Sequence, residues 1–157
     1  DLFGVSMIMP LILPHARDLG ASPAMAGVIG SVYGALQLVS SPLMGQWSDA
    51  IGHHFSLCVC LALSGINYML LALAASVTLL LVIRIPHGIF KHSQNFSKTY
   101  LTDLVPESQR SAVLGHFNAA SSIGFILGPV VGGHVAELPG GFHYVAVISG
   151  CVFVLNA

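Results

Sequence analysis

Residues 50–83 read AIGHHFSLCVCLALSGINYMLLALAASVTLLLVI and contain no Asp, Glu, Lys or Arg. About 20 consecutive apolar residues are enough for a helix to cross the hydrocarbon core of a membrane. The apolar character continues beyond this stretch, and a short polar interruption near Ser76 is where the chain would turn. We therefore predict an antiparallel pair of membrane-spanning helices at residues 55–75 and 78–100.

Comparable stretches without charged residues cover 19–48, 111–136 and 138–157. Only 7% of the 157 residues are charged and 55% are hydrophobic, whereas about 25% of the residues of a soluble domain are charged. Such an inventory cannot cover a water-exposed surface. The net charge of -1 offers no basic surface for nucleic acid. The sequence therefore predicts an all-α, multi-pass integral membrane protein that lies in a lipid bilayer.

Turns and polar clusters divide the chain into six predicted spans. A backbone in lipid must satisfy its hydrogen bonds internally, and these segments are too long for barrel strands, so each span is predicted to be a helix. Arg17 and Arg110 fall in loops on opposite sides, so the excess of Lys and Arg in cytoplasmic loops sets no orientation. We place the spans at residues 1–14, 22–45, 55–75, 78–100, 113–136 and 143–157, with the first and the last incomplete.

The predicted span at 78–100 carries basic side chains at membrane depth. Arg84, Lys91, Asn95 and Lys98 recur, together with Gly88, at steps of three and four residues, so one helix face would present them all. Charged side chains within a membrane normally face a bundle interior or a watery cavity. We predict that this face lines a transport cavity around Arg84, Lys91 and Asn95. For Lys98 we favour the alternative that its ammonium group reaches the headgroups.

Asp1 is the only carboxylate near the first span. A carboxylate at membrane depth can bind and release protons, because burial disfavours its charged form. Asp1 is therefore a candidate for coupling transport to protons or other cations. The alternative is an interfacial carboxylate near a helix end, and the sequence leaves both interpretations open.

Several kinds of catalytic machinery have no counterpart in the sequence. It contains no phosphate-binding loop of an ATP-driven pump. The eight His and three Cys residues show no zinc-ligand spacing, and no nucleophile stands beside a base and an acid in one motif. We expect no catalytic residue, no metal site and no cofactor.

Four motifs occur in the order, and on the spans, that are typical of one family of carriers. Residues 45–54 read GQWSDAIGHH and fit the loop signature G-x-x-x-D-x-x-G-R-R, except that two His residues replace its Arg pair. Span one supplies an acidic residue, a glycine and a proline; span four supplies R-x-x-x-G; span five supplies G-x-x-x-G-P-x-x-G-G at residues 124–133. The chain thus resembles the N-terminal half of the major facilitator superfamily. The matching positions are Asp1, Gly4, Pro10, Gly45, Asp49, Gly52, Arg84, Gly88, Gly124, Gly128, Pro129, Gly132 and Gly133, with His53 and His54 as the departures.

The loop between spans four and five is similar to that of the drug-proton antiporter and tetracycline-exporter branch, through Asp103, Pro106 and Arg110. Short stretches of sequence, such as GIFKH at residues 88–92, are also similar to those of an orphan vertebrate carrier of the same superfamily. The glycines of span five predict a helix that packs closely against a neighbour and can slide or rock.

The resemblance implies a twelve-helix carrier of two six-helix bundles, built from inverted three-helix repeats, in which the C-terminal bundle is missing from this chain. It also implies that the loop at 45–54 is cytoplasmic and that Asp49 latches the gate against the other half, with Gly45 and Gly52 permitting close approach. A neutral imidazole at His53 or His54 makes no charge-assisted bond, so this latch would be weaker or dependent on pH.

Two functions follow from these observations. The first is a secondary-active transporter of a small organic solute that works by alternating access, with antiport indicated by the span-five motif and proton coupling by Asp1. The alternative is a carrier-shaped membrane protein that senses a ligand or binds partners without transport, in keeping with the loss of the Arg pair. The sequence identifies neither the solute nor the membrane.

Overall fold

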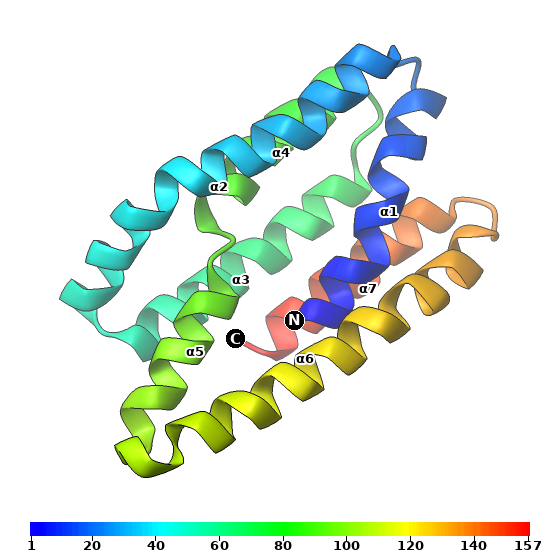
Figure 1. The fold of residues 1–157 in the computed structure, drawn as a ribbon. Coiled ribbons are helices and arrows are strands. Elements are labelled where there is room, and N and C mark those ends of the chain that lie inside the picture. Colours follow the sequence, from blue (N-terminus) through cyan, green and yellow to red (C-terminus); the bar gives the residue numbers. More distant parts are fainter.

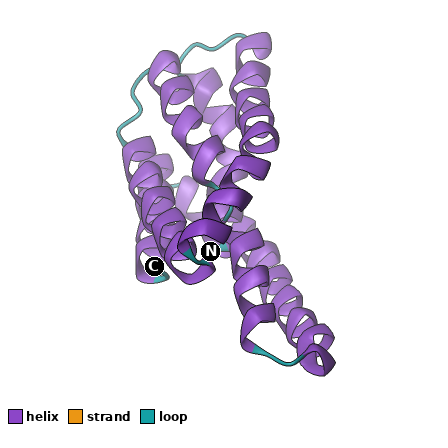
Figure 2. Cartoon of the chain, turned by 90° about the vertical axis from the view of Figure 1, so that its left-hand side faces the viewer, coloured by secondary structure: helices purple, strands orange, loops and turns teal.

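The computed structural model describes residues 1–157 as seven helices joined by short turns, with no strand (Figures 1 and 2). The predicted all-α fold is confirmed. Three helices, α2, α3 and α6, are long and apolar enough to cross a membrane, and α7 is a shorter apolar helix. The bounds are α1 (Leu2–Asp18), α2 (Pro23–Ile51), α3 (His53–Ala72), α4 (Val77–Phe90), α5 (Ser93–Leu104), α6 (Glu107–Ala136) and α7 (Gly141–Leu155).

Local capping explains where two of the helices begin. The Ser22 side chain accepts a hydrogen bond from the Met25 amide at 3.2 Å at the start of α2, where Pro23 occupies the first turn. Ser76 starts α4 in the same way, by accepting from the Leu79 amide at 3.2 Å. Gly52 alone separates α2 from α3, and its φ of 100° lies in the region where a side chain would be strained.

Several helices extend beyond the spans that the sequence predicts; α1, for example, continues to Asp18 rather than ending near residue 14. α2 continues to Ile51, through the segment predicted to be a polar loop from residue 46, and α6 begins at Glu107 rather than near residue 113. A helix satisfies its own backbone in water as well as in lipid, so hydropathy marks the membrane-crossing part and not the end of the helix. Pro106 precedes α6, and the acidic side chain of Glu107 lies in its first turn, which favours a start there.

Three helix pairs hold the bundle together: α1 packs on α6, α2 on α4, and α3 on α7. In Figure 1 the α2–α4 pair and α6 lie on opposite sides, with α3 and α7 between them and further from the viewer. The pairing is reciprocal. Helices α1–α3 form one set and α4–α7 the other. The first helix of each set packs on the long second helix of the other set, α1 on α6 and α4 on α2, and the last helices, α3 and α7, pack on each other. This is the packing expected of the two inverted three-helix repeats that the family resemblance implies.

The buried core lies where α1, α3, α4 and α7 meet, and it contains large side chains such as Met7, Tyr68 and Phe153. By contrast, α2 and α6 present apolar side chains outward: Leu38 is 77% exposed and Ile126 is 68% exposed. Exposed apolar surface of this extent needs lipid or another protein surface as its neighbour. The outer faces of α2 and α6 are therefore consistent with a protein that lies in a bilayer.

Candidate functional site

Span four is interrupted at Lys91 and His92, so the prediction of a single helix over 78–100 is wrong. Lys91 has φ −81° and ψ 60°, and His92 has φ −113° and ψ 12°, values that end α4 and precede α5. Arg84 therefore lies on α4, whereas Asn95 and Lys98 lie on α5. The predicted stripe of polar residues is divided between two helices and does not form one continuous face.

Side chains of α2 bind the backbone at this interruption. Gln37 Nε2 donates a hydrogen bond to the Lys91 carbonyl at 2.8 Å. Ser40 Oγ hydrogen-bonds His92 Nε2 at 2.9 Å and lies 3.4 Å from the Gly88 carbonyl oxygen. Because an unpaired backbone group costs several kcal/mol in the membrane core, these contacts compensate for helical hydrogen bonds that the break removes.

Asp1 lies at the start of α5, beside the break. Its two carboxylate oxygens accept hydrogen bonds from Ser93 Oγ at 2.5 Å and from Gln94 Nε2 at 2.6 Å. A negative charge is favourable at this position, because the partial positive charge of a helix lies at its N-terminus. The carboxylate thus joins the first span to the second part of span four.

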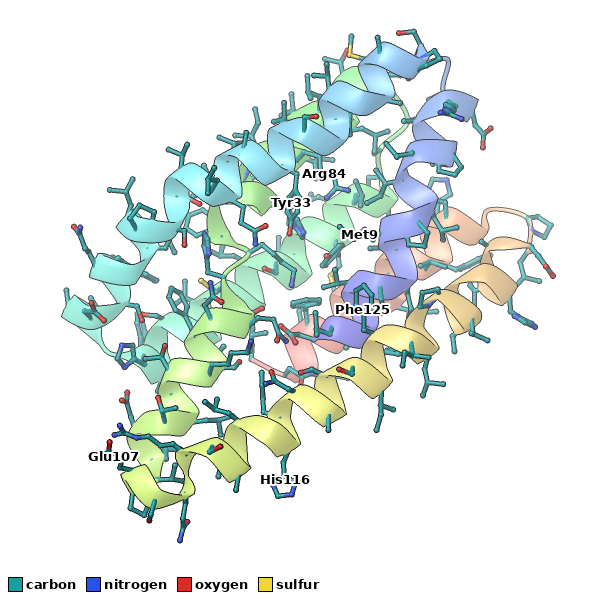
Figure 3. The ribbon with its side chains drawn as sticks, in the orientation of Figure 1. Met9, Tyr33, Arg84, Glu107, His116 and Phe125 are labelled. Carbon is teal, nitrogen blue, oxygen red and sulfur yellow. The ribbon has the colours of Figure 1, made fainter.

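Arg84 is buried, with only 8% of its surface exposed. Its guanidinium carbon lies 5.1 Å from the centroid of the Tyr33 ring, and its Nε has no hydrogen-bond partner. Figure 3 shows Arg84 and Tyr33 close together between α2 and α1, with Met9 on the neighbouring part of α1. His87, one turn further along α4, hydrogen-bonds the Tyr68 hydroxyl at 3.1 Å.

Lys91 is also buried, with 6% of its surface exposed, and its Nζ lies 4.2 Å from the centroid of the Phe153 ring. The only ion pairs of the chain involve His53. Neither Arg84 nor Lys91 is therefore paired with a carboxylate. Both basic side chains rest against aromatic rings inside the bundle.

These side chains line what we call the central cavity, which lies among α1, α2 and the break in span four. It comprises two neighbouring pockets, a larger one of about 130 Å³ and a smaller one of about 10 Å³ beside Arg84. Val5 and Tyr33 line both pockets. The larger pocket is also lined by Leu2, Gln37, Lys91, His92, Ser93, Gln94 and Asn95, and the smaller one by Ile8, Met9, Ile12, Tyr68, Arg84 and His87.

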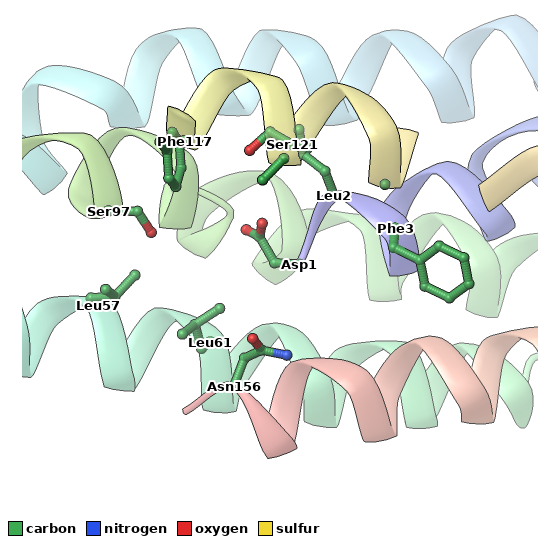
Figure 4. Close-up of a pocket in the computed structure, with 11 residues that line it drawn as sticks. Asp1, Leu2, Phe3, Leu57, Leu61, Ser97, Phe117, Ser121 and Asn156 are labelled. Atoms are coloured by element: carbon green, nitrogen blue, oxygen red, sulfur yellow. The ribbon is translucent and has the colours of Figure 1, made fainter. Parts of the chain in front are cut away.

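A larger cavity of about 330 Å³ lies on the other side of Asp1 (Figure 4). Its polar lining includes Ser97, Ser121 and Asn156, and Asp1 is its only charged side chain. The hydrogen-bond partners of Asp1, Ser93 and Gln94, line the central cavity instead. The carboxylate thus separates the two cavities.

A second polar cluster, which we call the His53 cluster, joins Asp49 at the end of α2, His53 at the start of α3 and Asp103 near the end of α5. His53 Nδ1 lies 2.6 Å from Asp103 Oδ2, and His53 Nε2 lies 3.0 Å from Asp49 Oδ1. A neutral imidazole has one donor nitrogen and one acceptor nitrogen, whereas two ionised carboxylates both need a donor. The doubly protonated, cationic form of His53 can donate to both carboxylates, so this geometry favours that form.

The part of α3 that we expect to cross the membrane begins at Phe55, so His53 lies outside it. Hydrogen bonds to Asp49 and then to Asp103 are the main causes that raise the pKa of His53 above its ordinary value. The sequence predicts that His53 and His54 weaken the latch formed by the loop at 45–54 or make its strength depend on pH. The structure brings His53 to a carboxylate 50 residues away, a contact that loop spacing alone does not indicate.

The other residues predicted for the loops after spans two and four make contacts of their own, outside the hydrogen bonds of the His53 cluster. His54 lies with its ring centroid 5.2 Å from that of Tyr100. Arg110 Nε donates to the Thr102 carbonyl at 3.1 Å, which ties the start of α6 to α5. A Cβ added at Gly45 or Gly52 would meet nothing within 4 Å. Close approach at these two glycines therefore does not occur within this chain.

The predicted span-five motif divides into packed and unpacked positions. Gly124, Gly128 and Gly132 face α1, and a Cβ at Gly132 would come within 2.5 Å of the Met7 carbonyl oxygen. Gly133 has open space around it and Pro129 is exposed. Only the positions four residues apart pack against α1, because they recur on one helix face.

Sequence analysis misses the contribution of α2 to the central cavity. Tyr33, Gln37 and Ser40 are spaced four and three residues apart, so they share the helix face that contacts Arg84 and the break. A lone amide such as Gln37 in an otherwise apolar span was the available signal, since polar side chains at membrane depth are usually functional. Tyr68 has no comparable signal, because an aromatic residue in an apolar helix is most often part of the core.

Comparisons with known proteins agree with the helical arrangement. A family model described as Major Facilitator Superfamily matches residues 1–157. The chain is 30% identical over 161 residues to the class E tetracycline resistance protein of Escherichia coli, covering 99% of this chain and 40% of that protein. It is 25% identical over 158 residues to the quinolone resistance protein NorA of Staphylococcus aureus, covering 98% of this chain and 40% of that protein.

A solved structure is similar as well. The crystal structure of the human organic anion transporter MFSD10 (TETRAN) matches with a TM-score of 0.75 and 25% sequence identity, covering 98% of this chain and 42% of that chain. The chain thus spans about two fifths of the length of the proteins it matches.

Proposed function

The chain belongs to the major facilitator superfamily, and from this premise we propose that it forms the first six-span half of a secondary-active transporter for a small organic solute. Membership makes it a multi-pass integral membrane protein. The proposed mechanism is alternating access, in which two bundles rock around a site near the middle of the membrane. The second bundle would come from the remainder of the natural protein.

The break in span four is the observation that carries this proposal. Irregular backbone at membrane depth is tolerated only where it is buried in protein or lines a cavity. Here it lies beside a cavity that also contains Lys91 and Asp1's hydrogen-bond partners. A purely structural bundle gains nothing from a broken helix and two buried basic side chains, whereas a solute site needs polar groups of this kind.

Asp1 is proposed to couple transport to protons. Its carboxylate lies between the two cavities and accepts two hydrogen bonds. Protonation would replace one acceptor site by an O–H group and weaken the contact with Ser93 or Gln94. Because these residues begin α5, a proton at Asp1 would loosen the contact between span one and the second part of span four.

The His53 cluster is proposed to stabilise the cytoplasmic end of the half-carrier, in the orientation that the family signature implies. It joins the ends of α2, α3 and α5 through one imidazole. Opening and closing of that end would then require this contact to be retained or broken, and the proton on His53 would decide its strength.

The experiment is solute-driven proton movement in proteoliposomes that contain the full-length protein, with the tetracycline-like and quinolone-like compounds suggested by its relatives as the first solutes. Transport is expected to move protons in the wild type and to become independent of the pH gradient in Asp1→Asn. A gradient-dependent flux that persists in Asp1→Asn would exclude Asp1 as the coupling residue. Ligand binding without any flux would instead support the alternative function, a carrier-shaped sensor or scaffold.

A further inference from the structure

A pocket between α3 and α4, which we call the lateral pocket, takes no part in the proposed function. Its volume is about 160 Å³. Three apolar side chains that line it, Leu63, Ile66 and Leu70, are exposed on the surface of the bundle, so they form its rim. They belong to α3, which is long and apolar enough to cross a membrane. The lateral pocket therefore opens at membrane depth, where a molecule dissolved in the bilayer reaches it.

The lateral pocket is separate from the central cavity. His87 is the only side chain that lines both, through the smaller pocket beside Arg84. Its Nε2 is already hydrogen-bonded to the Tyr68 hydroxyl. His87 thus forms the wall between the two sites, and its ring nitrogen Nε2 is not free for a ligand of the lateral pocket.

Two polar side chains of the lateral pocket carry atoms without a hydrogen-bond partner. Asn67 Nδ2 donates to the Ile83 carbonyl at 3.2 Å, but Asn67 Oδ1 accepts from nothing, and Ser64 Oγ also has no partner. Both side chains are more than nine-tenths buried, so they lie on the inner wall. They are three residues apart and share one face of α3. An unpaired polar atom is costly where no water reaches it, so this wall lacks a partner for each of the two atoms.

We propose that the lateral pocket binds a lipid-soluble phenol, a single aromatic ring with one hydroxyl group. A phenolic hydroxyl both donates and accepts. It therefore donates to Asn67 Oδ1 and accepts from Ser64 Oγ, and one group satisfies both atoms. The ring lies among the apolar side chains of Leu63, Leu70 and Phe90. The inference does not depend on the proposed function, because it concerns binding at a separate site.

The size and lining of the lateral pocket favour this occupant over water. An apolar cavity of about 150 Å³ is large enough to bind one benzene ring, and the lateral pocket has about 160 Å³. A buried water molecule typically makes about three hydrogen bonds. Only Asn67 Oδ1 and Ser64 Oγ lack partners here, and most of the other side chains that line the pocket are apolar.

The test compares two probes with the same ring, para-fluorophenol and para-fluoroanisole, in which a methyl ether replaces the hydroxyl. The purified full-length protein in lipid nanodiscs is titrated at neutral pH and followed by fluorine NMR, and empty nanodiscs measure partition into the lipid. The phenol is expected to bind saturably. The anisole cannot donate a hydrogen bond, so it should bind more weakly by about fivefold or more.

Four variants locate the binding site. Asn67→Leu should abolish the preference for the phenol, whereas Ser122→Ala, at an exposed serine of α6, should leave it unchanged. Leu70→Trp places a larger side chain at the rim and should weaken the binding of both probes. Leu73→Trp, at an exposed position of the same segment that does not line the pocket, should weaken neither.

The inference is overturned by any of four results. The first is no saturable binding of the phenol beyond that of empty nanodiscs, which would leave water or a lipid chain as the occupant. The others are equal binding of the two probes, an unchanged preference in Asn67→Leu, and equal effects of the two Trp variants. Leu70 and Leu73 are both exposed, so this last comparison remains decisive if Asn67→Leu fails to fold.

Discussion

Replacing Gly132 by Ala should separate α1 from α6. A Cβ at this position would lie 2.5 Å from the Met7 carbonyl oxygen and 3.0 Å from its Cα, both backbone atoms that cannot rotate away. Ordinary contact begins near 3.4 Å, so the two helices must move apart locally by roughly 0.9 Å, the difference between 3.4 and 2.5 Å. Overpacking of this kind costs about 1–3 kcal/mol.

Gly133→Ala is the matched control. Its added Cβ meets nothing within 4 Å, and it lies on the same helix, one residue away. Both substitutions share the gain in helix propensity, which is up to about 1 kcal/mol for Gly to Ala. The difference between the two variants therefore isolates the contact with α1, and we expect Gly132→Ala to be less stable by about 1–3 kcal/mol.

The assay is unfolding of the full-length protein in mixed micelles, titrated with SDS and followed by circular dichroism. Gly133→Ala should unfold at the wild-type SDS concentration or slightly above it, and Gly132→Ala should unfold earlier. Equal midpoints for the two alanine variants would refute the close α1–α6 contact. An earlier midpoint for Gly133→Ala would show that the opposite face of α6 is the packed one.

Three further outcomes follow from the site. Hydrogen bonds to Asp49 and Asp103 raise the pKa of His53, so the stability that His53 contributes is complete below the ordinary pKa of 6.5 and is lost as the pH rises through the raised pKa. The melting temperature of the wild type should therefore fall over that pH interval. A fall of equal size in His53→Ala would show that His53 is not its cause. The arginine of His53→Arg stays charged at every pH, so this variant should shift the full-length protein toward the outward-facing state. The shift is measured as altered reactivity of Asn95→Cys with an impermeant thiol reagent, and unchanged reactivity would exclude the loop at 45–54 as a latch at this position. Gln37→Leu removes the donor that lies 2.8 Å from the Lys91 carbonyl, and it should lower the stability measured in the SDS titration by about 1–3 kcal/mol. Gln109→Leu, at an exposed position, is the control and should not lower it. Equal effects of the two substitutions would mean that Gln37 does not stabilise the break in span four.

Much of the fold is readable from the sequence because hydropathy is a local property. The charge-free stretches predict the apolar helices, and the polar interruption near Ser76 predicts the turn between α3 and α4. Arg84 and Lys91 indicate the region of the site, since they are basic groups within an apolar span. These inferences need no knowledge of which helices touch.

The break in span four is not readable in this way. The segment at residues 78–100 has the periodicity of one helix, and nothing in it marks Lys91 and His92 as the interruption. The carbonyl groups that the break leaves unpaired are satisfied by Gln37 and Ser40 from another helix. A helix can break only where such partners are present, so its continuity is decided by contacts between residues 48 and 54 positions apart.

The candidate site likewise depends partly on local sequence and partly on tertiary contacts. The sequence by itself determined that this is a membrane protein of the major facilitator type, that Arg84 and Lys91 fall within an apolar span, and that His replaces Arg in the loop. The tertiary structure alone decided that Arg84 meets Tyr33 and no carboxylate, that His53 joins Asp103, and that Gly132 rather than Gly133 faces α1. Spacing along the chain sets which residues share a helix face, but only the packing of helices against one another sets what each face meets.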